Sequence, residues 1–206
     1  MKGQPSPIYR RILELVAACP ARGATKLVAI DGRGGSGKSS LAAHLMSIDH
    51  SLKLLPVDHF PCHSDEYPLH PTGVQIRISE ARLLTALLPL AENDAGVYRR
   101  SWWDNDRVGP LTRVEPGGTV LVEGCYSLLP SVRSLYDFSI WVECPYEQAL
   151  AQAIARDKKA GESGRARWEL GHAPNQERYI ETHRPSEFAD MVILSTPDAQ
   201  YRILRS

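Results

Sequence analysis

Short apolar runs alternate with amphipathic segments along most of the chain. Five of the runs are nearly continuous in Val, Ile and Leu and predict buried strands at residues 27–30, 54–57, 119–122, 138–142 and 191–194. A strand with one solvated face would instead alternate between apolar and polar residues. The runs therefore predict a five-stranded parallel sheet with helices on both faces.

Amphipathic segments lie before and between the predicted strands. Apolar residues recur every three or four positions from Ile8 to Cys19 and predict a helix over residues 7–19, which Pro20 ends. Further helices are predicted at residues 39–48, 79–88, 146–156 and 175–183. Strands that alternate with helices in this way predict an α/β doubly wound fold.

Two segments, residues 59–77 and 157–173, show little regular periodicity and are expected to be long loops. In a doubly wound fold, ligands bind among the loops at the carboxyl ends of the strands. We therefore expect both segments to lie beside the functional site.

Length and charge limit the classes of partner. The chain has 206 residues, which is most simply one domain over residues 1–206. Its 24 Lys and Arg balance its 24 Asp and Glu, so no overall field attracts nucleic acid or an anionic membrane surface. We expect a small-molecule substrate and neither nucleic acid nor a membrane as partner. The composition leaves open whether the protein is a homo-oligomer.

The first helix and the cysteines bear on the cellular location. Arg10, Arg11 and Glu14 interrupt the apolar core that a signal peptide requires. No later run approaches the roughly 18 consecutive apolar residues of a membrane span. The four cysteines are widely spaced, with no Cys-x-x-Cys pair, and are expected to be reduced thiols. These features predict a cytoplasmic protein.

The segment KLVAIDGRGGSGKSSLAAHL, residues 26–45, places a glycine-rich turn between a predicted strand and a predicted helix. Gly32, Gly37, Lys38 and Ser39 fit the pattern G-x-x-x-x-G-K-[ST]. In such a loop backbone N–H groups converge on phosphate oxygens, the lysine reaches the β- and γ-phosphates, and the hydroxyl binds Mg²⁺. The pattern predicts ATP and Mg²⁺ as cofactors and Lys38 as a catalytic residue. The candidate nucleotide-binding residues are Gly32, Arg33, Gly34, Gly35, Ser36, Gly37, Lys38, Ser39 and Ser40.

Acidic residues follow two other predicted strands. Asp58 comes after residues 54–57, and Glu123 comes after residues 119–122. Because the carboxyl ends of parallel strands meet at one edge, both carboxylates are expected near the phosphates. Asp58 could accept the proton of an attacking hydroxyl, and Glu123 could join Ser39 at Mg²⁺. The structural alternatives are a turn-forming Asp58 and an internally satisfied Glu123; Asp31, before the loop, is interpreted as structural.

The order of these motifs resembles the uridine kinase-like branch of the P-loop kinases, alongside phosphoribulokinase and nicotinamide riboside kinase. The matching segments are GRGGSGKSS (32–40), VDHF (57–60), VLVEG (120–124), ARD (155–157) and FADMVI (188–193). Together they extend over residues 27–194, and only the first is specific when taken alone.

The resemblance implies a P-loop NTPase fold with a small lid over about residues 157–173. It implies that Asp58 is the general base, that Glu123 supports Mg²⁺, and that Arg156 faces the phosphates. It also makes Arg165 the lid arginine, with a solvated basic loop as the alternative. Further basic lid candidates are Lys158, Lys159 and Arg167.

The acceptor is expected between Asp58 and the segment after it. YRRSWWD, residues 98–104, matches a place where relatives contact a nucleobase, so Tyr98 and Trp102 are candidate substrate contacts, with core packing as the alternative. PLHPTGV, residues 68–74, keeps His70 as a further candidate. It has Leu69 and Thr72 where uridine kinases carry acids for the ribose hydroxyls, so the acceptor need not be uridine.

Other classes fit less well. His59, Cys62, His63 and His70 match no common zinc spacing, so polar loop residues are expected there. A GTP-dependent switch would carry Asn-Lys-x-Asp, which is absent, and DRVG at residues 106–109 follows no apolar strand. The prediction is an ATP-dependent kinase for a nucleoside such as uridine or cytidine. Pantothenate, a sugar phosphate and nicotinamide riboside are alternative acceptors, and a regulatory ATPase is the rival class.

Overall fold

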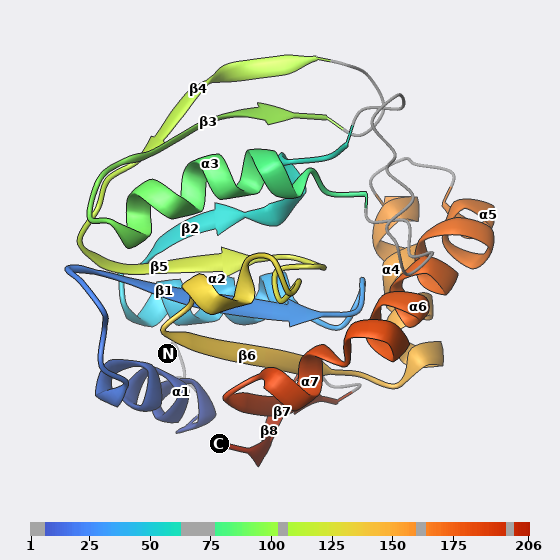
Figure 1. The fold of residues 1–206 in the computed structure, drawn as a ribbon. Coiled ribbons are helices and arrows are strands. Elements are labelled where there is room, and N and C mark those ends of the chain that lie inside the picture. Colours follow the sequence, from blue (N-terminus) through green and yellow to red (C-terminus); the bar gives the residue numbers. More distant parts are fainter. Residues whose placement is uncertain (1–6, 63–76, 103–106, 160–163, 197–199) are drawn as a thin grey trace.

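A six-stranded, mostly parallel sheet forms the centre of the protein (Figure 1). The structure is a computed structural model that describes residues 7–62, 77–102, 107–159, 164–196 and 200–206. Strands β2, β5, β1, β6 and β7 follow one another in this order and are parallel, and β8 pairs antiparallel with β7. Their bounds are β2 Lys53–Pro56, β5 Gly118–Glu123, β1 Thr25–Gly32, β6 Phe138–Glu143, β7 Met191–Ser195 and β8 Tyr201–Arg205.

The five predicted strands are therefore all present and parallel, and the α/β fold class is confirmed. The sixth strand, β8, was not predicted. It begins at Tyr201, whose ring is buried in the core and whose hydroxyl donates a hydrogen bond to the carbonyl of Gly37 at 2.8 Å. The strand is held by contacts with distant residues, which its short and partly polar sequence does not reveal.

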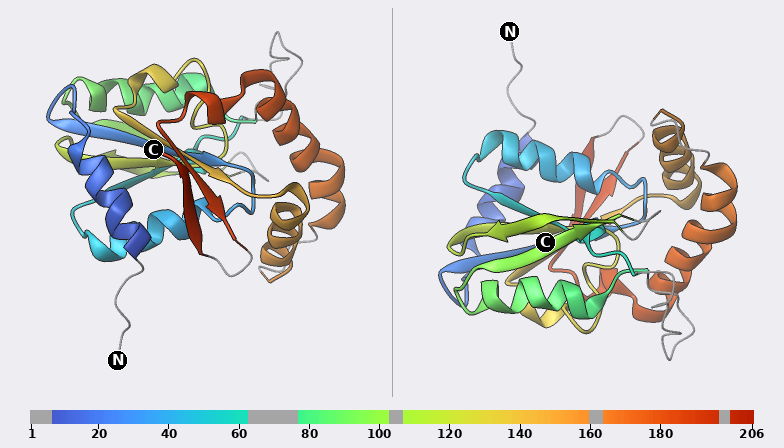
Figure 2. Two further views of the ribbon diagram at one scale, coloured as in Figure 1. Left: turned by 90° about the horizontal axis from the view of Figure 1, so that it is seen from below. Right: turned by 90° about the horizontal axis from the view of Figure 1, so that it is seen from above.

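Helices cover both faces of the sheet, as the continuous apolar runs predict (Figure 2). On one face α1 (Pro7–Ala18) and α2 (Lys38–Ile48) pack against Val28 and Ile30 of β1. On the other, α3 (Glu80–Ala91) packs against Leu27 and Ala29 of the same strand. Successive β1 side chains thus enter opposite cores, which is why apolar residues are needed at every position.

A group of helices lies beyond the carboxyl ends of the central strands (Figure 1). It consists of α4 (Tyr146–Lys159), α5 (Arg165–Arg167), a π-helical turn η3 (Trp168–His172) and α6 (Ala173–His183), followed by α7 (Pro185–Phe188). Most of the predicted irregular segment 157–173 is therefore helical where the structure describes it. Trp168 is buried against Ala153 and Ala173, and this packing fixes a helical conformation that the local pattern did not indicate.

A two-stranded hairpin lies outside the main sheet and was also not predicted. Strands β3 (Gly96–Ser101) and β4 (Val108–Val114) pair antiparallel, and β3 packs against α3. Tyr98 and Val114 point into the core shared with α3, whereas Val108 and Leu111 are exposed. Two short 3₁₀ turns, η1 (Val57–His59) and η2 (Arg133–Leu135), complete the described elements. Within the described ranges, no helix has both the length and the apolar character to cross a bilayer.

Candidate functional site

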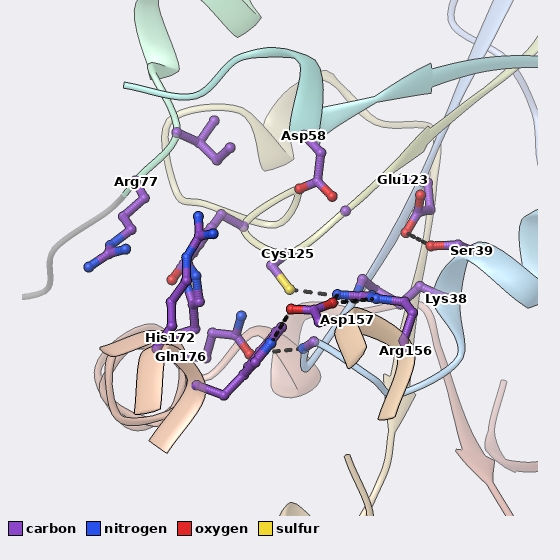
Figure 3. Close-up of a pocket in the computed structure, with 16 residues that line it drawn as sticks. Lys38, Ser39, Asp58, Arg77, Glu123, Cys125, Arg156, Asp157, His172 and Gln176 are labelled. Carbon is purple, nitrogen blue, oxygen red and sulfur yellow. Dashed lines mark hydrogen bonds and ion pairs between the residues drawn. The ribbon is translucent and has the colours of Figure 1, made fainter. Parts of the chain in front are cut away.

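Strand register brings the predicted acidic and glycine segments to one edge of the sheet. Glu123 pairs with Ile30 of β1 on one side and with Pro56 of β2 on the other. The glycine loop, η1 with Asp58, and the turn at Gly124 therefore leave the sheet side by side. They enclose a cavity of about 340 Å³ together with α4, η3 and α6 (Figure 3).

The glycine loop has the conformation that its sequence predicts. Gly35 and Gly37 have φ of 86° and 94°, which side chains disfavour. The loop leads into α2, whose first N–H groups have no acceptor within the helix. Packing is a second reason for glycine, since a Cβ at Gly34 would collide with the Trp168 ring and one at Gly35 with the Ala149 carbonyl.

Lys38 is buried in this cavity. Its Nζ donates a hydrogen bond to the Arg33 carbonyl at 2.9 Å and lies 3.5 Å from Sγ of Cys125. Burial disfavours the charge, but the neighbouring Cys125 and the carboxylates of Glu123, Asp31 and Asp58 outweigh it, so the pKa of Lys38 is raised. The ammonium group is therefore held charged where the loop would receive an anion.

Ser39 and Glu123 form a pair of oxygen donors next to Lys38. The Ser39 hydroxyl donates to Oε1 of Glu123 at 3.0 Å. Burial raises the pKa of Glu123, against the lowering effect of Lys38. A hydroxyl and a carboxylate fit Mg²⁺, which takes few protein ligands and otherwise binds water and phosphate oxygens. In the described part of the chain, no three His, Cys, Asp or Glu side chains cluster as a metal site. Two members of the zinc combination considered above, His63 and His70, lie outside the described residues.

Asp58 points into the same cavity from η1 (Figure 3). Its side chain is exposed, while the residues that follow anchor the turn. Nδ1 of His59 lies 3.0 Å from the Tyr98 hydroxyl, and Phe60 is fully buried against the Tyr98 ring. The Asp58 carboxylate therefore faces the cavity from a turn that the contacts of His59 and Phe60 with Tyr98 hold in place.

Arginines line the wall opposite the sheet, but not all as predicted. Arg156 lines the cavity and pairs with Asp157 at 3.0 Å. Arg165, the predicted lid arginine, does not line it; its guanidinium pairs with Glu169 at 2.7 Å on the surface. Arg167 lines the cavity instead, because residues two apart on a helix point in different directions.

Several predicted nucleotide contacts have side chains with other roles. The Arg33 guanidinium pairs with Glu143 at 2.6 Å and Glu177 at 2.7 Å, which leaves only its backbone for a ligand. Ser36 is fully buried, and Ser40 is exposed on α2, with its carbonyl 2.6 Å from Nδ1 of His44.

Of the predicted acceptor contacts, Asp58 lines the cavity, whereas Tyr98 and Trp102 do not. Tyr98 is buried behind η1, and Trp102 lies beside the guanidinium groups of Arg100 and Arg107, 5.1 Å and 5.6 Å from its ring centroid. His70 lies outside the described residues. The alternative of core packing fits Tyr98, which was predicted from its aromatic neighbours and from the place of this segment in the resembling family.

The structure adds cavity residues that the sequence analysis did not single out. They include Arg77, Cys125, Tyr126, His172 and Gln176. The one sequence signal for Tyr126 was its position in the turn just after the predicted strand that ends at Glu123. In the structure it adopts φ of 73°, which is uncommon for a bulky residue. The others reach the cavity through tertiary contacts, as when Oε1 of Gln176 accepts the Gly34 N–H at 2.8 Å.

Asp31 has the structural role interpreted for it. Its carboxylate is fully buried and accepts hydrogen bonds from the N–H groups of Gly32 at 2.7 Å and Leu128 at 2.9 Å. The Tyr179 hydroxyl donates to it at 2.7 Å. One carboxylate thus joins the start of the glycine loop to α6 and to the turn after β5.

Solved structures with the same architecture were found, although no family model and no curated protein sequence matches the chain. A structure described as a possible uridine kinase from Bacillus stearothermophilus is 15% identical with a TM-score of 0.65, covering 89% of this chain and 96% of that one. D-glycerate 3-kinase from Cryptococcus neoformans is 14% identical with a TM-score of 0.63, covering 99% and 100%. A candidate fructose transport system kinase from Silicibacter sp. TM1040 is 22% identical with a TM-score of 0.59, covering 91% and 95%.

The chain has the fold of the P-loop kinases. At these identities the likeness establishes the fold alone.

Proposed function

We propose that the protein is a kinase that transfers the γ-phosphate of ATP, with Mg²⁺, to a hydroxyl group of a small molecule. The observation that carries the proposal is that Lys38, the Ser39–Glu123 pair and Asp58 face one cavity. They supply a cation, a pair of oxygen donors and an exposed carboxylate, and phosphoryl transfer from a nucleotide requires these groups.

Each group has a role in this proposal. The amides of the loop from Gly35 to Ser39 bind the phosphates, and Lys38 supplies positive charge at the β- and γ-oxygens. Ser39 and Glu123 hold Mg²⁺, which when bound neutralises charge on the same oxygens. Asp58 orients the acceptor hydroxyl and takes its proton, and Arg156 compensates charge on the transferring group.

Two kinds of acceptor have support. The resemblance to uridine kinases favours a nucleoside such as uridine or cytidine. The names of two structural neighbours favour a sugar or glycerate. A regulatory ATPase is the alternative outside the kinases, and it would need no acceptor.

The test is ADP production from Mg·ATP in the presence of nucleosides, sugars, sugar phosphates, sugar acids and vitamins such as pantothenate. A kinase gives acceptor-dependent ADP release, which Lys38→Ala abolishes because charge at the phosphates is lost. Arg113→Gln, which removes an exposed cation that pairs with Glu115 on the hairpin, should leave turnover unchanged. Slow hydrolysis that no acceptor stimulates would instead identify an ATPase.

A further inference from the structure

The glycine loop contains little that could fix its own conformation. Gly34 and Gly35 follow one another without side chains, and Gly35 has φ of 86°. Glycine has more backbone conformations open to it than other residues, so two in succession leave the peptide groups around them free to rotate. The affinity for a ligand falls when the binding-competent conformation is only partly populated. Contacts that hold this loop from outside can therefore set its affinity for phosphate.

Helix α6 supplies such contacts. Three of its side chains bind residues in the loop or just before it. The pairs are Tyr179 with Asp31, Glu177 with Arg33, and Gln176 with Gly34. The first two pairs join side chains, whereas Oε1 of Gln176 accepts the Gly34 N–H at 2.8 Å. Among these three contacts, the Gln176 bond is the one that reaches the main chain of the loop.

The peptide group between Arg33 and Gly34 is held on both sides. Its N–H donates to Gln176, and its carbonyl accepts from Nζ of Lys38 at 2.9 Å. The same carbonyl accepts the Ser36 N–H at 3.0 Å, which closes a turn. A peptide group is planar, so its N–H and its carbonyl rotate together. A rotation that broke the Gln176 bond would therefore also move the oxygen that binds Lys38.

The Gln176 bond is shielded from water. Gln176 is only 8% exposed, and the Trp168 ring packs against Gly34 beside it. A Cβ on Gly34 would lie 2.4 Å from a carbon of that ring and 3.2 Å from Nε2 of Gln176. Water therefore has little access to the Gly34 N–H. If the side-chain acceptor were removed, a buried donor would be left unpaired, which costs more than an ordinary hydrogen bond contributes.

The bond uses no group to which the proposed function assigns the phosphates. Those groups are Lys38 and the amides from Gly35 to Ser39, and the Gly34 N–H is not among them. Gln176 lines the cavity beside the loop (Figure 3). Its hydrogen bond can therefore persist when Lys38 turns to the β- and γ-phosphates, and it then keeps the loop in place.

We propose that Gln176 is a positioning residue of the kinase site, which holds the Arg33–Gly34 peptide and through it the Lys38 ammonium group. The inference rests on the proposed function and deepens it, because Lys38 serves phosphoryl transfer only if its charge lies at the β- and γ-oxygens. A loop that is held before the nucleotide arrives loses less freedom on binding. Gln176 acts through the loop and takes no part in bond changes.

Gln176→Met tests the bond, because methionine has nearly the same length and no oxygen acceptor. We expect the Kd of a non-hydrolysable ATP analogue with Mg²⁺ to rise about 5- to 10-fold, since loop conformations that satisfy the Gly34 N–H elsewhere then compete with the binding-competent one. Isothermal titration calorimetry measures the Kd. Glu181→Met is the matched control, because Glu181 is exposed on the same helix, and it should leave the Kd unchanged.

A double-mutant cycle with Lys38→Ala separates positioning from a general structural role. If Gln176 acts on the phosphates through Lys38, the factor by which Gln176→Met raises the Kd should be at least about 3 times smaller when the lysine side chain is absent. Residues that contribute independently would instead give the same factor in both backgrounds.

Gln176→Glu is the second variant, in case Gln176→Met does not fold. Its carboxylate keeps an oxygen acceptor for the Gly34 N–H but brings a negative charge next to the phosphates. Protonation removes the charge and leaves the carbonyl oxygen in place. The ratio of its Kd to that of the unaltered protein at the same pH should therefore exceed one and fall as the pH is lowered. A ratio that does not change with pH would overturn the inference.

Failure of the inference and failure of the proposed function are distinguishable. The inference is overturned if Gln176→Met folds and leaves the Kd unchanged, or if its effect is the same with and without the Lys38 side chain. Acceptor-dependent ADP release would then still identify a kinase. If no acceptor stimulates ADP release and Lys38→Ala does not alter binding of the ATP analogue, the proposed function itself fails.

Discussion

Asp58 and Glu123 are two carboxylates of one cavity in different surroundings. Asp58 is exposed on η1, whereas Glu123 is buried, accepts the Ser39 hydroxyl and has a raised pKa because of its burial. An exposed carboxylate beside an open volume can meet an incoming hydroxyl, and a buried one fixed to Ser39 can only hold something at the loop. The different roles proposed for them follow from environment, since the two side chains have the same chemistry.

Asp58→Asn tests the role of the base at this scale. The amide keeps the shape but cannot take a proton, so we expect kcat to fall by about 10² or more, the usual size of general-base effects. ATP-analogue affinity, measured by isothermal titration calorimetry, should stay within a few-fold. Unchanged phosphoryl transfer would mean that another residue takes the proton.

His172 makes stability depend on pH. Its pKa is about 4 in the folded protein against 6.5 when unperturbed, so the unfolded chain binds a proton that the folded protein excludes. Stability is therefore lost as pH falls from about 6.5 towards 4. His172→Gln should gain stability relative to the unaltered protein over this range, measured by urea unfolding at several pH values. If the free energy of unfolding changed with pH in the same way for both proteins, the lowered pKa of His172 would be contradicted.

At the scale of elements, Asp31 connects the ends of β1 and β5 to α6. The glycine loop begins at the next residue, so any shift of this carboxylate moves the loop relative to the cavity. Its burial raises its pKa, and hydrogen bonds from Leu128, Tyr179 and Gly32 oppose the rise. The hydrogen bonds compensate for the free-energy cost of burying the Asp31 carboxylate in the core.

Substitutions that remove more of the hydrogen bonds around Asp31 should lower the free energy of unfolding by larger amounts. Tyr179→Phe removes one donor and should cost about 1 kcal/mol of unfolding free energy. Asp31→Asn turns an NH₂ group towards N–H donors and should cost more than ~2 kcal/mol, because a buried donor is left unpaired. Urea unfolding measures both, and equal, small losses would show that the network contributes little.

At the scale of the whole molecule, the glycine loop is enclosed from several sides. Trp168 of η3 lies against Gly34, α4 passes beside Gly35, and the Tyr201 hydroxyl of β8 bonds the Gly37 carbonyl. A ligand on the loop would therefore join sheet, helices and the last strand. Its binding should be visible as stabilisation of the entire domain.

A non-hydrolysable ATP analogue with Mg²⁺ tests this coupling. At 100 times its Kd it should add about 2.7 kcal/mol and raise Tm by roughly 5–10 °C for a chain of this size. Lys38→Ala should reduce the shift at equal ligand concentration, and Arg113→Gln should not. Absence of any shift in the unaltered protein, measured by differential scanning calorimetry, would argue against nucleotide binding.

Sequence alone determined the five parallel strands, most of their helices and the glycine loop, because each depends on local periodicity or on residues adjacent in the chain. It also placed Lys38, Ser39, Asp58 and Glu123 at one edge, because Asp58 and Glu123 directly follow predicted strands, the glycine loop leading to Lys38 and Ser39 follows another, and parallel strands end together.

Only the tertiary structure decided the rest. The hairpin, β8 and the helical turns of residues 165–172 form because they pack on distant elements, which short sequence windows do not register. Packing between distant elements also decided that Arg167 and not Arg165 lines the cavity, and that Tyr98 is buried behind η1. Arg77 and Gly171 are far apart in the chain and adjacent in space, so this contact exists only once the chain has folded.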